Sequence, residues 1–267
     1  MLSLHRTQFP SSKDELAQAI DEALRRFVRK AGPIVTAQSR VFPYFDEIAI
    51  NVDGAQFDSL PPGPAAVAGE TRLAFEAAIV TLNARHISVQ GAPLDLRMEA
   101  HDVVFHKGQD ENGEAVLRVH KVRNGQVVIS ASQLDLENAL AQIGGREARR
   151  HGIVIEQVRL AMRARGARSI AADIWLQARK FLLRANIDIY GQLDIDENFM
   201  AKISQLKCKS DGAIGSLACS ALDPHLRQLE GKTFSPMSLR FMEIQVRDVR
   251  VAVTDTIEIT ADFGSAG

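Results

Sequence analysis

The sequence predicts an α+β fold in which a long, highly curved antiparallel β-sheet is rolled around one long helix. Residues 211–230 place apolar side chains at three- and four-residue intervals, which is typical of a helix with one apolar face. Most of the sequence on either side, between residues 153 and 263, alternates between apolar and polar residues, as half-buried strands do. One apolar helix beside so much half-buried sheet favours a sheet that wraps the helix.

Length and composition narrow the class of protein. The 267 residues predict a single elongated domain over 1–267 with a sizeable core. A net charge of −1 and 6% aromatic residues argue against nucleic acid as a partner. No apolar run reaches the roughly 18 residues that cross a bilayer, and the first residues lack the pattern of a secretory signal. We therefore expect a cytoplasmic or membrane-peripheral protein, unless a leader is missing from this chain.

The first predicted element is an amphipathic helix over residues 12–31. Ser12 and Glu15 have the spacing of a capping box, and Gly32-Pro33 follows the last apolar residue of the helical pattern. The polar side of this helix is basic. Such a helix can lie on an anionic membrane, or it can pack on a domain and leave its charges in solvent.

Short strands follow the first helix. We expect them at residues 45–52, 86–90, 94–100, 103–106 and 116–122, after a Pro/Gly-rich loop at 58–69. Residues 108–113 form a polar hairpin loop. Asn124-Gly125 predicts a type I′ turn before a further strand at 127–129.

A second helix is predicted over residues 132–143 and is expected to stop at Gly144-Gly145. Long strands follow at 158–162, 170–178, 181–189 and 199–208. Pro224 lies inside the pattern of the helix at 211–230, so we expect a kink there or a restart with Asp223 as the N-cap. The last strands are expected at 239–246, 249–253 and 257–263.

The two cysteines, Cys208 and Cys219, have two interpretations. In a cytoplasmic protein they are expected to be buried thiols, which is the interpretation that the absence of a signal favours. A disulfide that closes a short loop is the alternative, and it would matter in an exported protein.

No strong catalytic or metal-binding motif is present, so we expect a protein that is not an enzyme and has no cofactor. His101 and His106 lie five residues apart on a predicted strand and therefore point to opposite faces. Asp194 and Asp196 share a strand face, where a solvated pair is the simpler interpretation. The serines have no His–Asp arrangement nearby in the sequence, although a triad is defined by geometry.

Basic residues outnumber acidic ones between residues 146 and 184. Arginine side chains in this region suit phosphate groups. We name Arg159, Arg163, Arg165 and Arg168 as candidates for contact with a lipid headgroup or an anionic surface. The alternative is the solvated outer face of a sheet, whose charges pair with acids elsewhere.

The segments VVISASQLDLENAL, KCKSDGAIGSLACSALDPHLRQLEGKTFSP and LRFMEIQVRDVRVAVTDTIEITADF carry a resemblance to a known family. Together with ARHISVQGAPLDLRMEAHDVVF, they make residues 84–263 resemble a bacterial family of LmeA-like proteins in the tubular lipid-binding (TULIP) superfamily. The resemblance lies in the order of elements and in hydrophobic spacing. It implies a curved antiparallel sheet around a helix, an elongated apolar groove for acyl chains, and no chemistry.

The family offers no fixed ligand contacts to carry over. The candidate apolar lining is therefore taken from the helical stripes: Leu140, Ile214, Leu217, Leu222 and Leu226. Ordinary core positions are the alternative for each. The leading hypothesis is non-enzymatic binding of a lipid or fatty-acid-like ligand, and transport of that ligand is an extension of it. A structural or protein-interaction module with a filled core is the second hypothesis.

Overall fold

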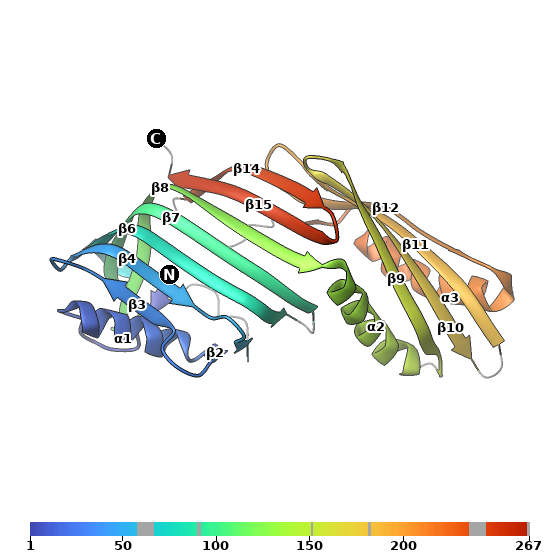
Figure 1. Cartoon of the computed structure of the whole chain (residues 1–267), viewed down its shortest axis with the longest axis horizontal. Coiled ribbons are helices and arrows are strands. Elements are labelled where there is room, and N and C mark those ends of the chain that lie inside the picture. Colours follow the sequence, from blue (N-terminus) through green and yellow to red (C-terminus); the bar gives the residue numbers. More distant parts are fainter. Residues whose placement is uncertain (58–66, 90–91, 151, 181–182, 235–243, 266–267) are drawn as a thin grey trace.

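The computed structural model describes residues 1–57, 67–89, 92–150, 152–180, 183–234 and 244–265. Its long strands form two sheets, which lie one after the other along the long axis of the molecule (Figure 1). The large sheet has the strand order β14-β15-β8-β7-β6-β4-β3, with β1 paired to β8. The small sheet has the order β13-β12-β11-β10-β9.

The large sheet consists of β1 (Leu2–Ser3), β3 (Val35–Gln38), β4 (Tyr44–Asn51), β6 (Val67–Val89), β7 (Ala92–Asp110), β8 (Ala115–Ser132), β14 (Ile244–Val253) and β15 (Thr256–Ser265). The small sheet consists of β9 (Val154–Gly166), β10 (Ser169–Lys180), β11 (Leu183–Ile195), β12 (Ala201–Ser210) and β13 (Thr233–Phe234). A further pair is formed by β2 (Val28–Arg29) and β5 (Gln56–Phe57). The helices are α1 (Lys13–Leu24), α2 (Gln133–Arg150) and α3 (Gly212–Leu229).

The prediction of a mostly antiparallel sheet with a few helices is confirmed, whereas the roll around one helix is not seen in the described residues. The sheet divides in two, and neither part closes into a barrel. Helix α3 packs on β11 and β12 at one side of the small sheet instead of lying inside a roll. One pair of strands, β4 and β6, is parallel, which the sequence did not indicate.

Helix α1 begins as predicted but ends earlier. The Ser12 hydroxyl accepts a hydrogen bond from the Glu15 amide, as an N-cap does. The helix ends at Leu24 instead of near residue 31, because the following segment is hydrogen-bonded to a side chain of the helix. The Asp21 carboxylate accepts hydrogen bonds from the amides of Ile34 and Val35, and this turns the following segment back toward the helix.

The turn expected at Asn124-Gly125 does not exist, because β8 runs through both residues without interruption. The glycine is there for a different reason. A Cβ atom at Gly125 would lie 2.4 Å from the ring of Phe263 on β15 and 2.9 Å from the carbonyl oxygen of Glu99 on β7. The position therefore admits only glycine because an aromatic ring covers the strand.

A bend crosses four neighbouring strands of the large sheet at one level. Along each strand the buried residues are three positions apart there, instead of the two that a flat strand gives. The pairs are Phe45 and Ile48 on β4, Ala77 and Val80 on β6, Ala100 and Val103 on β7, and Val122 with the half-buried Gly125 on β8. Asp102, at the bend of β7, has a φ of 48°. The irregularity is therefore shared by four neighbouring strands and is not local to one of them.

Helix α2 starts as predicted and continues past the two glycines that were expected to end it. The Ser132 hydroxyl caps the Asp135 amide, and the helix extends to Arg150. Gly144 lies close to β9, where an added Cβ would be 3.2 Å from the Cδ1 atom of Ile155. The glycine therefore allows α2 to approach the strand, and it does not act as a stop signal.

Among the described residues, two clusters of buried apolar side chains form the core. The larger cluster joins α1 to the large sheet around Leu16, Ile20 and Phe75. The smaller one lies where the two sheets meet, and it contains Ile170, Ile195 and Ala201 of the small sheet with Val249, Val251 and Ala261 of the large sheet. A backbone hydrogen bond from Val251 N to Ala167 O, 2.7 Å long, crosses the same junction.

The strands of the small sheet confirm the sequence prediction, with one strand for each of the four expected. Strands β9 and β10 cover their expected ranges, whereas β12 begins at Ala201, two residues after the expected start at residue 199. Residues 181–182, which the prediction placed in β11, lie outside the described residues. The strands expected at 239–246 and 249–253 form a single strand, β14, and residues 239–243 lie outside the described part of the chain. Helix α3 continues through Pro224 as one helix, so the expected restart at Asp223 is not found.

Candidate apolar binding surface

The small sheet has one apolar face. Residues that pair across antiparallel strands point to the same side of a sheet. The paired rows are Leu160–Ile174–Ile189 and Val158–Leu176–Ile187, from β9, β10 and β11. Leu160 and Ile187 are buried, whereas the other four side chains are only half-buried. An apolar face of this kind is covered incompletely by the described residues of the protein.

The large sheet carries a similar face on its last strands. One row joins Leu96 on β7, Ile129 on β8, Ile259 on β15 and Val251 on β14. Except for Val251, these side chains are half-buried. The next row, from Met98 through Val127, leads to Ala261 in the buried cluster at the junction.

The two apolar faces meet at this junction, because the cluster there contains residues from both. We call the combined surface the apolar band. It comprises the rows given above on the small sheet (Val158, Leu160, Ile174, Leu176, Ile187 and Ile189) and on the large sheet (Leu96, Met98, Val127, Ile129, Val251 and Ile259), joined through the junction cluster. The sequence showed the alternation of each strand but not which strands would share one surface.

Helix α2 lies between the two parts of the band. It contacts β7 and β8 of the large sheet and runs beside β9 of the small sheet. Leu140, one of the predicted lining residues, is half-buried on α2 next to the buried Ala139. The Glu137 carboxylate accepts a hydrogen bond of 2.8 Å from the backbone amide of Leu160, which satisfies one backbone donor on the outer edge of β9.

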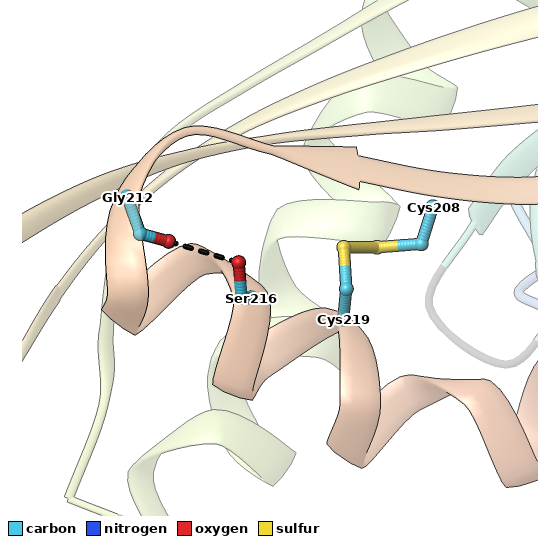
Figure 2. The surroundings of a disulfide bond; sticks show 4 residues. All are labelled: Cys208, Gly212, Ser216 and Cys219. Carbon is cyan, nitrogen blue, oxygen red and sulfur yellow. Dashed lines mark hydrogen bonds between the residues drawn. A yellow bond between two sulfur atoms is a disulfide. The ribbon is translucent and has the colours of Figure 1, made fainter.

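Helix α3 is fixed on the apolar face of the small sheet by a disulfide. Cys208 on β12 is bonded to Cys219 on α3, with 5.6 Å between their Cα atoms (Figure 2). The expectation of two free thiols was therefore wrong. Cys208 pairs with Ile189, so it points to the apolar side, where the side chain at 219 meets it. Gly215, one turn earlier, is buried against Ser210.

The predicted lining residues of α3 fall into two groups. Leu222 and Leu226 follow Cys219 by three and seven residues, so they share its side of the helix, and both are half-buried. Leu217 is 71% exposed and lies about 160° around the helix from Cys219, away from the sheet. The side chain of Ile214 lies outside the described part of the structure.

Two of the four predicted headgroup arginines point away from the apolar band. Arg159 and Arg163 alternate with Leu160 and Met162 along β9, so they point to the opposite face of the small sheet. Their contacts are local. Arg159 lies over the ring of Trp175 at 5.4 Å, and Arg163 forms a 2.9 Å ion pair with Asp173.

The other two arginines are also held by contacts within the protein. Arg165 is 3.5 Å from the Tyr190 hydroxyl. Arg168 forms a 2.7 Å ion pair with Asp248 and donates a hydrogen bond to the Val249 carbonyl, so it links the two sheets. A structural role at the junction therefore accounts for Arg168.

The acidic and histidine candidates are separated from one another. Asp194 accepts hydrogen bonds from Ser169, Gln192 and Ser204. Partial burial opposes its ionisation, but these hydrogen bonds outweigh that effect and hold the pKa of Asp194 below its usual value. Asp196 instead accepts amide hydrogen bonds in the turn that follows β11.

The histidine pair does not converge either. His101 is 2.9 Å from Glu99, and His106 stacks on His120. Within the described ranges, no three His, Cys, Asp or Glu residues are close enough to hold a metal ion. No described helix is both long and apolar enough to cross a membrane.

Two open clefts lie at α1, away from the apolar band. The larger, of about 560 Å³, lies between α1 and residues 4–11. The second, of about 490 Å³, lies beside residues 25 and 28–31. No sequence pattern indicated the first cleft, because its walls come mainly from a segment without regular structure.

Comparisons with family models, with curated proteins and with solved structures found no match to this chain.

Proposed function

We propose that this protein binds a lipid or another long apolar ligand on the apolar band, without catalysing a reaction. The observation that carries the proposal is the incomplete burial of Val158, Ile174, Leu176 and Ile189 on the face of the small sheet toward α3. Residues at such positions in a packed domain are normally covered. Binding of an acyl chain would be stabilised by roughly 0.8 kcal/mol for each CH₂ group that is buried there.

The two helices fit this proposal. Helix α2 and the disulfide-linked α3 lie at opposite sides of the apolar face of the small sheet, so an acyl chain would lie between them. In this interpretation the small sheet and α3 close around a ligand in the manner implied by the resemblance to the tubular lipid-binding superfamily. Leu140, Leu222 and Leu226 would contact the ligand.

The first test is native mass spectrometry of the purified chain, followed by organic extraction and lipid analysis. We expect phospholipid or fatty acid to co-purify in near-stoichiometric amount. A chain that is empty, and that also takes up no fluorescent acyl probe, would overturn the proposal.

A matched pair of variants places the ligand on one face of the sheet. Leu176→Glu puts a charge on the apolar face, whereas Gln177→Glu puts the same charge on the neighbouring position of the other face. We expect the first variant to reduce acyl-probe affinity by about tenfold or more, because a carboxylate in an apolar site loses its hydration. Equal affinities for the two variants would place the ligand elsewhere.

The lining residues of α3 provide a second comparison. Leu222→Glu should weaken probe binding, whereas Leu217→Glu should leave it unchanged, since Leu217 points away from the sheet and is 71% exposed. Circular dichroism of each variant checks that the fold is retained.

A protein-interaction module is the second candidate function, and one observation favours it. Val41, Tyr44 and Leu73 are 67%, 56% and 49% exposed, and they lie near one another at one end of the large sheet, where Tyr44 pairs with Glu76. Light scattering of the purified chain tests it: a stable oligomer that Val41→Ser/Tyr44→Ser disrupts, in protein that holds no lipid, would favour this function.

A further inference from the structure

The face of the small sheet opposite the apolar band has a distinct composition. Its central positions carry aromatic and charged side chains: Arg159, Trp175, Tyr190, Lys207 and Lys209. Register places them side by side, because Trp175 pairs with both Arg159 and Asp188, Asp188 pairs with Lys209, and Tyr190 pairs with Lys207. We call this the basic–aromatic face. Helix α3 lies on the other side of the sheet (Figure 1).

Positive charge exceeds negative charge on this face after local ion pairs are taken into account. Arg163 is neutralised by Asp173. Lys207 and Lys209 are exposed and form no ion pair within the described part of the chain, and Arg159 contacts a ring instead of a carboxylate. Asp188 is the exposed acid that lies among them. The whole chain has a net charge of only −1, so the basic character belongs to this face and not to the protein as a whole.

The aromatic residues make the face more than a solvated patch. Trp175 is the single tryptophan of the chain and is half-buried between Arg159 and Asp188. Tyr190 lies in the next row, with its hydroxyl 3.5 Å from Arg165. Tryptophan and tyrosine favour the boundary between water and hydrocarbon, and arginine and lysine beside them favour anionic headgroups.

We propose that the basic–aromatic face docks the protein on an anionic phospholipid bilayer. A single-stranded nucleic acid is the other polyanion that such residues attract, but it needs open ring faces for base stacking. The guanidinium group of Arg159 lies over the Trp175 ring, 5.4 Å from its centre, and occupies one of those faces. In that position Arg159 can still direct N–H groups to phosphate oxygens.

This proposal does not depend on a ligand in the apolar band, because the two surfaces lie on opposite sides of the sheet. Acyl-probe uptake measures one and vesicle binding measures the other. Either can fail while the other succeeds.

The experiment uses Trp175 as an internal reporter in the full chain. Large vesicles of phosphatidylcholine alone, or of phosphatidylcholine with phosphatidylglycerol, are titrated into the protein while tryptophan emission and co-sedimentation are measured. We expect binding and a blue shift of the emission with the anionic vesicles only, and release at high salt.

Two double charge reversals provide the variant and its control. Lys207→Glu/Lys209→Glu should weaken vesicle binding by about tenfold or more, since each basic group near the surface contributes about fivefold. Arg40→Glu/Lys121→Glu makes the same change of net charge on exposed residues away from the small sheet and should leave binding nearly unchanged.

Three results would overturn the proposal. These are no binding to anionic vesicles, equal losses in both double variants, and a Trp175 response to single-stranded oligonucleotides without a response to vesicles. All variants change exposed side chains, and circular dichroism confirms that each is folded.

Discussion

Gly125 is one position where the identity of a single residue follows directly from its surroundings. The ring of Phe263 lies across it, and no side chain fits beneath that ring. The sequence pair Asn124-Gly125 is typical of a hairpin turn, so the local signal predicted the wrong structure. Glycine is required at position 125 because of a contact with residue 263. A contact between residues so far apart cannot be detected in a short window of the sequence.

Substitution of Gly125 should therefore be costly. We expect Gly125→Ala to lower the free energy of unfolding by about 2 kcal/mol, because Cβ would displace the Phe263 ring. Urea denaturation measures it. Gly166→Ala is the control, since a Cβ at Gly166 has no neighbour within 4 Å, and it should be nearly neutral. Equal effects of the two substitutions would contradict this account.

Asp21 is a second residue with a specific role, since it joins the end of α1 to the start of β3. Burial opposes ionisation of its carboxyl group, but hydrogen bonds from the amides of Ile34 and Val35 and from Arg25 hold the pKa of Asp21 below its usual value. A folded-state pKa below the unfolded value of about 3.9 gives stability that is present above that pH. The contribution is lost as the pH falls through the folded pKa.

We expect Asp21→Ala to lower the free energy of unfolding by about 2 kcal/mol at pH 7, because two amides lose a charged acceptor. The difference from the natural chain should shrink as the pH falls below about 4. Urea denaturation at pH 7 and at pH 3 tests both statements. Asp14→Ala is the control, because its side chain is 93% exposed. A pH-independent difference would argue against the role of the carboxylate.

The elements of the small sheet were the most predictable part of the fold. Strands β9 to β12 alternate regularly and are short enough that each pattern belongs to one strand. Strands β6, β7 and β8 were divided into shorter pieces in the prediction, because the shared bend interrupts the alternation in each. The prediction ended α2 at Gly144, because glycine is favoured both at the end of a helix and where a helix packs closely against a strand.

Pairing between elements was less predictable than the elements themselves. The parallel contact of β4 with β6 and the division into two sheets depend on partners far apart in sequence. The candidate site shows the same limit. The predicted lining included Leu140, Leu222 and Leu226 of the helices beside the band. It did not include the strand residues Ile174 and Leu176. Their alternation was visible in the sequence, whereas their incomplete cover was not.

The link between β12 and α3 gives a prediction at the scale of elements. Replacing both cysteines, as Cys208→Ser/Cys219→Ser, should lower the free energy of unfolding by about 3 kcal/mol, since the disulfide closes a loop with a sequence separation of 11 residues. Denaturation with and without dithiothreitol measures the effect. The natural chain should respond to the reductant and the variant should not.

Alkylation gives an independent check of the same bond. Without reductant, iodoacetamide should leave both cysteines unmodified, and after reduction it should add two groups to the denatured chain. Two groups added without reduction, in protein isolated under oxidising conditions, would show that the bond does not form.

The whole molecule is packed unevenly. The lobe that contains α1 has a large cluster of buried residues around Phe75, whereas the apolar side chains of the small sheet are mostly half-buried outside the junction. The lobe of α1 and the large sheet is therefore well packed, whereas the lobe of the small sheet is less completely packed. Incomplete cover of this kind is what the proposed ligand site on the apolar band requires.

The uneven packing has a consequence for amide hydrogen exchange. Amides of β10 and β11 should exchange faster in the empty protein than those of β6 and β7, because fewer buried contacts hold them closed. A ligand on the apolar face of the small sheet would slow the first group and leave the second nearly unchanged. Exchange rates in the large sheet can therefore serve as an internal reference for measuring ligand protection in the small sheet.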